Sequence, residues 1–146
     1  MTLTLRPVTR ATLDAVLALQ VTEPQRGFVA PNILSMAQAA VMPQLCPRGV
    51  YAGETLVGFA LYGLDPEEQA YCIDRLMIDA AYQGLGYGCG ALHLLMAEIR
   101  AQRPARPVVY LSVLPDNAAA IALYTRFGFV PDGRTVDGET VYRFQL

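Results

Sequence analysis

Apolar positions recur along the chain at two spacings, and each spacing predicts a different secondary structure. Residues 3–8 alternate between apolar and polar side chains, which predicts a strand of roughly six residues near the N-terminus. The apolar residues that follow recur every three or four positions, as on one side of a helix. We therefore expect a helix that begins at Thr9 or Arg10, directly after this strand.

A loop and a second helix are expected next. Residues 20–32, QVTEPQRGFVAPN, contain two prolines and a glycine, so they cannot continue a helix. Within this loop we expect Phe28 and Val29 to be exposed. A second helix is expected from Ser35, a suitable N-cap residue, and it should end before Pro47.

Two strands and a turn follow. Residues 48–53 and 56–64 predict a hairpin around Gly53-Glu54. The second of these strands is almost entirely apolar, as is typical of a central strand that is covered on both faces. The acidic residues at 65–68 then predict an exposed turn.

The second half of the chain continues the alternation of strands and helices. It first predicts a strand at 73–78 and a helix that carries Leu92, Leu95, Met96 and Ile99 on one side. A strand at 108–113 and a helix capped by Asp116 and ended by Gly128 are expected next. The last two strands, at 129–134 and 140–144, should form a hairpin around Asp137-Gly138. No internal repeat or linker interrupts this order. We therefore expect one α/β domain over residues 1–146.

Composition narrows the function classes. The chain of 146 residues is 53% hydrophobic and 16% charged, and its size suits a single domain with a substantial core. A net charge of −2 argues against a nucleic-acid partner, which usually requires a basic face. No apolar run is long enough for a membrane span, and the N-terminus does not resemble a signal peptide. We expect a cytoplasmic protein without a membrane or nucleic-acid partner.

The cysteines do not predict a metal site. Cys46, Cys72 and Cys89 are odd in number and lack the C-x-x-C spacing of a zinc ligand pair. We expect three reduced thiols in or near the core, with no metal and no disulfide framework.

Residues 83–88, QGLGYG, carry the strongest chemical signal. They connect a predicted strand to a predicted helix, so their backbone N–H groups lie at a helix N-terminus, where an anion is favoured. Glycine at 84, 86 and 88 removes the Cβ atoms that would hold a ligand away from the backbone. This turn is therefore expected to bind the pyrophosphate of a nucleotide-bearing cofactor.

Two other phosphate-binding motifs fit less well. Residues 86–91 can be read as G-x-G-x-x-A, a dinucleotide-binding fingerprint, but no acidic ribose partner lies about twenty residues later. A Walker motif needs lysine, and all eleven basic residues of this chain are arginine. A nicotinamide enzyme is thus a distant alternative.

The pattern Q-x-x-G-x-G at 83–88, after apolar residues spaced as Ile73, Leu76 and Ile78, resembles the acyl-CoA-binding motif of the GCN5-related N-acetyltransferases (GNAT). Residues 117–129 resemble the N-x-x-A-x-x-x-Y-x-x-x-G-F signature of the same family. The order of predicted elements also matches. The resemblance implies a mixed central sheet of about seven strands, with helices on both faces and a V-shaped splay between the fourth and fifth strands.

The resemblance also implies acetyl-CoA as the cosubstrate and a set of cofactor-binding residues. These are Leu76, Met77 and Ile78 on the strand, Gln83, Gly84, Leu85, Gly86, Tyr87 and Gly88 in the glycine turn, and Asn117 on the pantetheine arm. In such a site one N–H near Ile78 polarises the thioester carbonyl. For Asn117 the structural alternative is helix capping, which Asp116 could fill instead.

Two residues are expected to be catalytic. Tyr124 matches the family tyrosine that protonates the leaving thiolate, and its structural alternative is a buried core tyrosine. Asp74 is the candidate base for an ammonium acceptor, with a water relay as the alternative, although it could simply pair with Arg75. On a regular strand Asp74 would share a face with Leu76, unless a bulge intervenes. His93 is expected to be a surface or packing residue.

The segments VGFALYGL, DRLMIDAAYQGLGYG and YLSVLPDNAAAIALYTRFGF resemble the bacterial diamine and polyamine branch of the family. This resemblance implies acetyl transfer to a primary amine of a small polyamine or diamine. Acetylation of a protein N-terminus or lysine is the alternative enzyme, and a non-catalytic acyl-CoA sensor is the alternative of another class. The chain has Ala80 where a proline is frequent in the family. The sequence does not identify which arginine would bind the 3′-phosphate of CoA. The apolar composition permits a homodimer.

Overall fold

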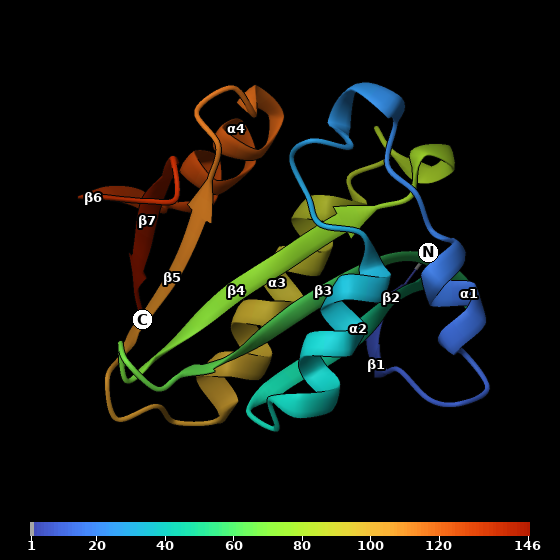
Figure 1. The fold of residues 1–146 in the computed structure, drawn as a ribbon, viewed down its shortest axis with the longest axis horizontal. Helices are drawn as coiled ribbons and strands as arrows, with labels where there is room; N and C mark the ends of the chain where they lie inside the picture. Colours follow the sequence, from blue (N-terminus) through green and yellow to red (C-terminus); the bar gives the residue numbers. More distant parts are fainter. Residues whose placement is uncertain (1) are drawn as a thin grey trace.

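The computed structural model describes residues 2–146 as one twisted sheet with helices on both faces (Figure 1). The strands are β1 Leu3–Pro7, β2 Leu45–Ala52, β3 Thr55–Asp65, β4 Ala70–Ile78, β5 Val108–Val113, β6 Val130–Val136 and β7 Glu139–Gln145. Their order in the seven-stranded sheet is β1-β2-β3-β4-β5-β7-β6. Among these seven described strands, only β4 and β5 pair in parallel. The expected mixed sheet is confirmed.

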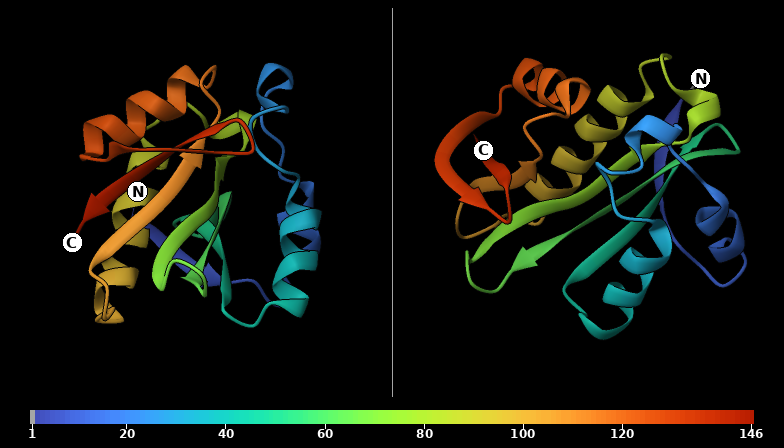
Figure 2. Two further views of the ribbon diagram at one scale, coloured as in Figure 1. Left: turned by 60° about the vertical axis from the view of Figure 1, so that its left-hand side comes forward. Right: turned by 45° about the horizontal axis from the view of Figure 1, so that its top comes forward.

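The helices divide between the two faces of the sheet. Figure 1 shows α1 Leu13–Ala18 and α2 Asn32–Val41 in front, and α3 Tyr87–Ala101 behind. α4 Ala118–Phe127 lies on the same side as α3, because both helices contribute to one apolar cluster. Short 3-10 helices, η1 Glu23–Gln25 and η2 Ala80–Tyr82, lie at the same end of the sheet (Figure 2).

The two parallel strands separate soon after they meet. They pair only at Tyr71 with Val109 and at Cys72 with Tyr110, and beyond this point they diverge into an open V (Figure 1). The β3–β4 pairing steps from Arg75 to Ile73, so Asp74 is the extra residue of a β-bulge. A bulge bends its strand and ends regular pairing. The expected splay between the fourth and fifth strands is confirmed.

The core beneath α3 follows the predicted helical spacing. Leu92, Leu95, Met96 and Ile99 are almost completely buried against the sheet. Burying such a side chain stabilises the fold by about 1.5–3 kcal/mol. This apolar face fixes α3 across the sheet, and therefore also fixes the glycine turn at its N-terminus.

Both N-terminal helices begin elsewhere than expected. α1 starts at Leu13 because Thr12 accepts a hydrogen bond from the Thr9 N–H at 2.9 Å, which forms a turn first. α2 starts at Asn32, after Pro31. Ser35 is fully buried inside α2 and is not its cap, so that expectation was wrong. The local sequence could not show that the Asn32 amide would bond to the Val16 carbonyl at 2.9 Å.

The strand β2 begins at Leu45, three residues earlier than the expected start at Arg48, and includes Pro47. Proline lacks the N–H that a central strand needs, but it is tolerated where one edge is free. β1 ends opposite Arg48, so Pro47 faces only β3, where it pairs with Leu61. The prediction that the second helix ends before Pro47 is confirmed, because α2 ends at Val41. The prediction that the strand starts after Pro47 was wrong.

Among residues 2–146, no helix combines the length and the apolar character that crossing a membrane requires. The three cysteines are all free thiols, each partly buried.

Candidate active site

The glycine turn has the backbone of an anion site. Gly84 and Gly86 have positive φ values of 78° and 83°, in the left-handed region that favours glycine. The first intrahelical bond of α3 runs from the Gly90 N–H to the Gly86 carbonyl. The N–H groups of residues 87–89 therefore have no acceptor within the helix and are directed toward its N-terminal end.

The packing glycine of this segment is Gly90 and not one of the motif glycines. A Cβ atom on Gly90 would lie 2.4 Å from the Leu3 side chain of β1, whereas nothing lies within 4 Å of a Cβ on Gly84 or Gly86. For Gly88 the nearest atom would be 3.8 Å away. Tight packing therefore does not explain the three motif glycines, and open space in front of the turn agrees with a ligand.

The free edge of β4 exposes alternate backbone groups to the V. The Asp79 N–H donates to the Val57 carbonyl at 2.8 Å, so Asp79 and Met77 direct their backbone groups toward β3. Leu76 and Ile78 consequently present theirs to the open edge. The Ile78 carbonyl accepts from the Gln83 amide at 2.9 Å, which leaves its N–H available. The backbone groups of Met77 are thus paired with β3 and are not presented to the open edge.

A slot of about 190 Å³ brings most of the expected cofactor-binding residues together. It lies between the edge of β4 and α4, and its walls include Leu76, Met77, Ile78, Gln83, Gly88, Asn117 and Tyr124. Gly84, Gly86 and Tyr87 belong to the adjacent turn and do not line this slot. Leu85 is 63% exposed and points away from the core. The sequence therefore located the slot, but not which motif residues line it.

A larger hollow of about 490 Å³ continues from the slot into the mouth of the V, and we call it the acidic hollow. The two share six lining residues, which are Phe28, Val29, Leu76, Asn117, Ala120 and Tyr124. Its carboxylates are Asp74, Asp137 and Glu139, and its cationic residues are Arg26 and Arg75. Three acids and two arginines thus line the hollow, with Asp74 on β4, and Asp137 and Glu139 at the β6–β7 turn and the start of β7.

Tyr124 combines the expected roles of core and site residue. It is only 7% exposed, and its ring packs edge-on against Phe129 at 5.8 Å between centroids. The same side chain lines both the slot and the acidic hollow. Burial raises the pKa of Tyr124 to about 12. The phenol therefore stays protonated throughout the neutral range and can act as a hydrogen-bond or proton donor.

Asp74 lies at the bulge of β4, which changes its direction from that of a regular strand. Ile73 and Leu76 are three residues apart, yet both pack into the core beneath α3 because the bulge takes up one residue. Asp74 therefore does not share a face with Leu76, as it would without a bulge. Asp74 instead lines three neighbouring hollows, one of which is the acidic hollow.

The protein environment moves Asp74 toward the range of a general base. Burial raises the pKa of Asp74 to about 6, although Arg75 opposes this rise and Asp65 adds to it. Judged by its solvent-accessible surface, Asp74 is exposed. It nevertheless lies within the acidic hollow, whose walls exclude much of the surrounding water. The Arg75 guanidinium donates to the Asp74 backbone carbonyl at 2.8 Å and makes no ion pair with the carboxylate among the described contacts.

The cap of α4 is Asn117 and not Asp116, so the expected division of roles was wrong. The Asn117 side-chain oxygen accepts from the Ala120 N–H at 3.3 Å. Asp116 is exposed one residue before the cap. The cap uses only the amide oxygen, so the NH₂ group of Asn117 still has two donors at the border of the slot and the acidic hollow.

Sequence reasoning missed the loop that covers this site. Phe28 and Val29 are half-buried rather than exposed, and both line the slot and the acidic hollow. Their apolar character in a loop was the available signal. Asp137 and Glu139 were interpreted only as a hairpin turn, because nothing local shows that β7 inserts between β5 and β6.

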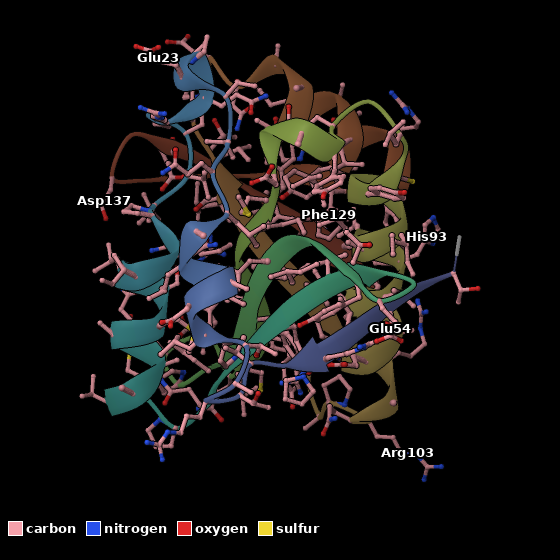
Figure 3. The ribbon with its side chains drawn as sticks, turned by 90° about the vertical axis from the view of Figure 1, so that its right-hand side faces the viewer. Glu23, Glu54, His93, Arg103, Phe129 and Asp137 are labelled. Atoms are coloured by element: carbon pink, nitrogen blue, oxygen red, sulfur yellow. The ribbon has the colours of Figure 1, made fainter. Side chains whose placement is uncertain are left out.

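His93 lies away from the V. In Figure 3 its label is on the α3 side of the molecule, opposite Asp137 and Glu23. Its ring packs against Phe127 with 4.6 Å between centroids. The expectation of a surface or packing residue is confirmed.

The comparisons with known proteins agree with this geometry. The profile of the acetyltransferase (GNAT) family matches residues 15–129. A spermine/spermidine N(1)-acetyltransferase of Bacillus subtilis (strain 168) is 33% identical over 148 aligned positions, which cover 97% of each chain. The N-alpha-acetyltransferase RimI of Mycobacterium tuberculosis is 40% identical over 84 positions, which cover 56% of this chain and 49% of RimI.

A solved structure of similar fold is that of spermidine N-acetyltransferase from Vibrio cholerae in complex with CoA and spermine. It superposes with a TM-score of 0.75 at 18% identity, covering 97% of this chain and 92% of that one. Acetyl-CoA is the cosubstrate that the family assignment implies. On the family match, the 33% identity over nearly the whole chain and the splayed sheet, the protein belongs to the GNAT family and is an N-acetyltransferase.

Proposed function

We propose that this enzyme transfers the acetyl group of acetyl-CoA directly to a primary amine of a small polyamine or diamine. The observation that carries the proposal is the acidic hollow, where the carboxylates of Asp74, Asp137 and Glu139 outnumber the guanidinium groups of Arg26 and Arg75. Clustered carboxylates attract a cationic acceptor. The relative from Bacillus subtilis, named as a spermine/spermidine acetyltransferase, supports the same acceptor class.

The glycine turn is the proposed site of the CoA pyrophosphate, which would accept hydrogen bonds from the backbone at 83–88. The pantetheine arm would follow the free edge of β4, beside the backbone groups of Leu76 and Ile78. The available Ile78 N–H is the proposed donor to the thioester carbonyl, where negative charge develops during attack. The NH₂ group of Asn117 would bind the arm from the opposite wall.

Asp74 is the proposed general base. An amine acceptor arrives mostly as ammonium and must lose a proton before it attacks the thioester. A carboxyl group with a pKa of about 6 is mostly ionised at pH 7.5 and is more basic than an ordinary aspartate. It can accept the proton directly or through one water molecule.

Tyr124 is the proposed general acid. After attack, the C–S bond breaks and the CoA sulfur leaves as a thiolate that must be protonated. The Tyr124 phenol lies at the junction of the slot and the acidic hollow and stays protonated at neutral pH. It would donate its proton to the sulfur and recover one from solvent.

Peptide acetylation is the competing function. The match to RimI covers only about half of this chain, so it says little about the acceptor side. A protein substrate needs an open groove for its backbone, whereas here residues 26–31 close one side of the acidic hollow. A CoA sensor without turnover would retain the slot but need neither Asp74 nor Tyr124.

The test is thiol release from acetyl-CoA with spermine, spermidine, putrescine, an aminoglycoside and peptides bearing a free N-terminus or lysine. We expect release with the polyamines, increasing from pH 6 to pH 8.5. Release with peptides alone would instead support the peptide function. No release with any acceptor, together with a melting temperature that acetyl-CoA still raises, would favour the sensor.

A homodimer in a reducing compartment is proposed as the working form. α2 contains no charged residue, and Ile33, Leu34, Val41 and Met42 are 64%, 45%, 78% and 43% exposed. An exposed apolar face of this kind suits an interface, and a two-fold dimer would pair the face with its own copy. Free thiols at all three cysteines agree with a cytoplasmic location. Sedimentation of wild type as a dimer and of Val41→Glu as a monomer would support this form; a monomeric wild type would contradict it.

A further inference from the structure

The loop of residues 20–31, here called the covering loop, is joined to the glycine turn by a pair of glutamine side chains. Gln25 in η1 donates to the Gln83 side-chain oxygen at 3.1 Å, and Gln83 donates back to the Gln25 oxygen at 2.8 Å. The two residues are 58 positions apart in sequence. We call this pair the glutamine clasp.

The orientation of both amides is fixed by backbone groups at either end of the clasp. The Thr22 N–H donates to the Gln25 oxygen at 3.2 Å, and the Gln83 NH₂ group donates to the Ile78 carbonyl at 2.9 Å. Each amide therefore has only one arrangement that satisfies its partners. The clasp therefore connects the start of η1 to the end of β4, and the donor and the acceptor of each of its hydrogen bonds are defined.

The covering loop forms a wall of the site. Phe28 and Val29 follow the clasp by three and four residues and line both the slot and the acidic hollow. Before the clasp, the loop is fixed at Gln20, whose N–H donates to the Asp79 carboxylate at 2.9 Å and whose carbonyl accepts from Ala80 at 2.8 Å. Among the described side-chain hydrogen bonds, the clasp alone joins the loop beyond Gln20 to the turn at 79–88. Figure 2 shows η1 beside the end of β4.

We infer that Gln25 is a positioning residue for the acceptor, acting through Gln83. The turn that Gln83 opens is where the cofactor pyrophosphate is proposed to bind, and the loop that Gln25 carries is a wall of the acidic hollow. A ligand that orders one side of the clasp therefore orders the other. Cofactor and acceptor then strengthen each other's binding by the same factor, as linkage requires. This inference rests on the proposed function for the identity of the two ligands.

The kinetic test uses Gln25→Ala, Gln83→Ala and the double variant, with the polyamine that wild type acetylates best. Loss of two neutral hydrogen bonds should raise the KM for the amine by about tenfold, while kcat changes by less than about threefold. The double variant should show no greater increase than Gln83→Ala alone, because Gln83→Ala already removes both bonds of the clasp as well as the bond to the Ile78 carbonyl. Gln102→Ala, at the exposed end of α3, is the matched control and should leave both parameters unchanged.

A second readout needs no acceptor. Trypsin cleaves after arginine or lysine, the chain has no lysine, and Arg26 lies exposed in the covering loop before Gly27. Acetyl-CoA should slow cleavage after Arg26 at least about fivefold in wild type, because the clasp couples loop opening to the occupied turn. In Gln25→Ala it should slow this cleavage less than about twofold, although it still raises the melting temperature.

These outcomes separate the inference from the proposed function. If no polyamine is acetylated but acetyl-CoA protects Arg26 only when the clasp is intact, the acceptor assignment is wrong and the positioning role of Gln25 stands. Equal protection in wild type and Gln25→Ala would overturn the inference. So would an unchanged KM for the amine, or additive effects of the two single substitutions.

Discussion

At the scale of single residues, burial gives two side chains opposite uses. The Tyr124 phenol lies in the core, where burial holds the proton on its oxygen. The Asp74 carboxylate lies in the bulge of β4, where burial makes it more basic than an ordinary aspartate. One environment favours a donor and the other an acceptor. The two residues line the same hollow, as their proposed roles of general base and general acid require.

Substitution of Tyr124 by Phe tests the donor. Phe retains the packing against Phe129 but loses the hydroxyl, so the fold should persist. We expect kcat to fall by about a hundredfold, the usual contribution of a general acid, while the KM for acetyl-CoA changes little. Steady-state kinetics with both substrates varied measure this, and an unchanged kcat would remove the acid role.

Substitution of Asp74 by Asn tests the acceptor in both activity and stability. We expect kcat/KM for the amine to fall by about a hundredfold at pH 7.5. The pKa of Asp74 is about 6 in the folded state and about 4 in the unfolded state, so ionisation of Asp74 destabilises the fold. This destabilisation develops as the pH rises from about 4 to about 6, and it is complete above about pH 6. Asp74→Asn should therefore raise the melting temperature at pH 8 and change it little at pH 4.

The control for Asp74→Asn is Asp116→Asn, because Asp116 is an exposed aspartate that caps nothing. It should alter neither the activity nor the pH dependence of the melting temperature. Suppose instead that Asp74→Asn loses activity but gains no melting temperature at pH 8. This result would mean that folding does not raise the pKa of Asp74.

At the scale of secondary-structure elements, the start of α3 depends on backbone conformation more than on side chains. The left-handed conformation of Gly86 directs the following N–H groups into the space in front of the helix. An L-residue in this conformation costs about 1–2 kcal/mol. The apolar face of α3 holds the turn in place, so strain at one residue is expected to distort the turn rather than move the helix.

Gly86→Ala should therefore weaken cofactor binding and not only stability. We expect a loss of about 1 kcal/mol in the free energy of unfolding and an increase of about tenfold in the KM for acetyl-CoA. Gly133→Ala is the matched control, since Gly133 also has a positive φ, of 93°, and open space around a Cβ, but lies on β6 away from the slot. It should reproduce the stability loss alone. Equal KM values for the two variants would contradict an anion site at the turn.

At the scale of the whole molecule, the site exists because the sheet is incomplete. The parallel strands β4 and β5 share only two paired positions before they diverge. The gap that remains has a free strand edge on one side, α4 on the other and the covering loop across its mouth. Each wall comes from a different part of the chain, so the site forms only when the fold is complete.

The sequence by itself determined the parts that depend on local pattern. The alternating and helical spacings predicted the strands, the buried face of α3 and the order of the elements. The glycine spacing at 83–88 predicted the anion site, because a backbone that passes from strand to helix through glycines has few other uses. Tyr124, Asn117 and the β4 residues were found by motif, and most of them do line the slot.

Tertiary structure alone decided what depends on partners that are distant in the sequence. The bulge at Asp74 appears only in the pairing with β3, and the insertion of β7 beside β5 brings Asp137 and Glu139 to the hollow. The start of α2 at Asn32 reflects a bond to the Val16 carbonyl. The glutamine clasp joins residues 58 positions apart, and nothing in the periodicity of either segment indicates it. Local patterns specify which elements form, whereas burial and hydrogen bonds between elements specify which side chains meet.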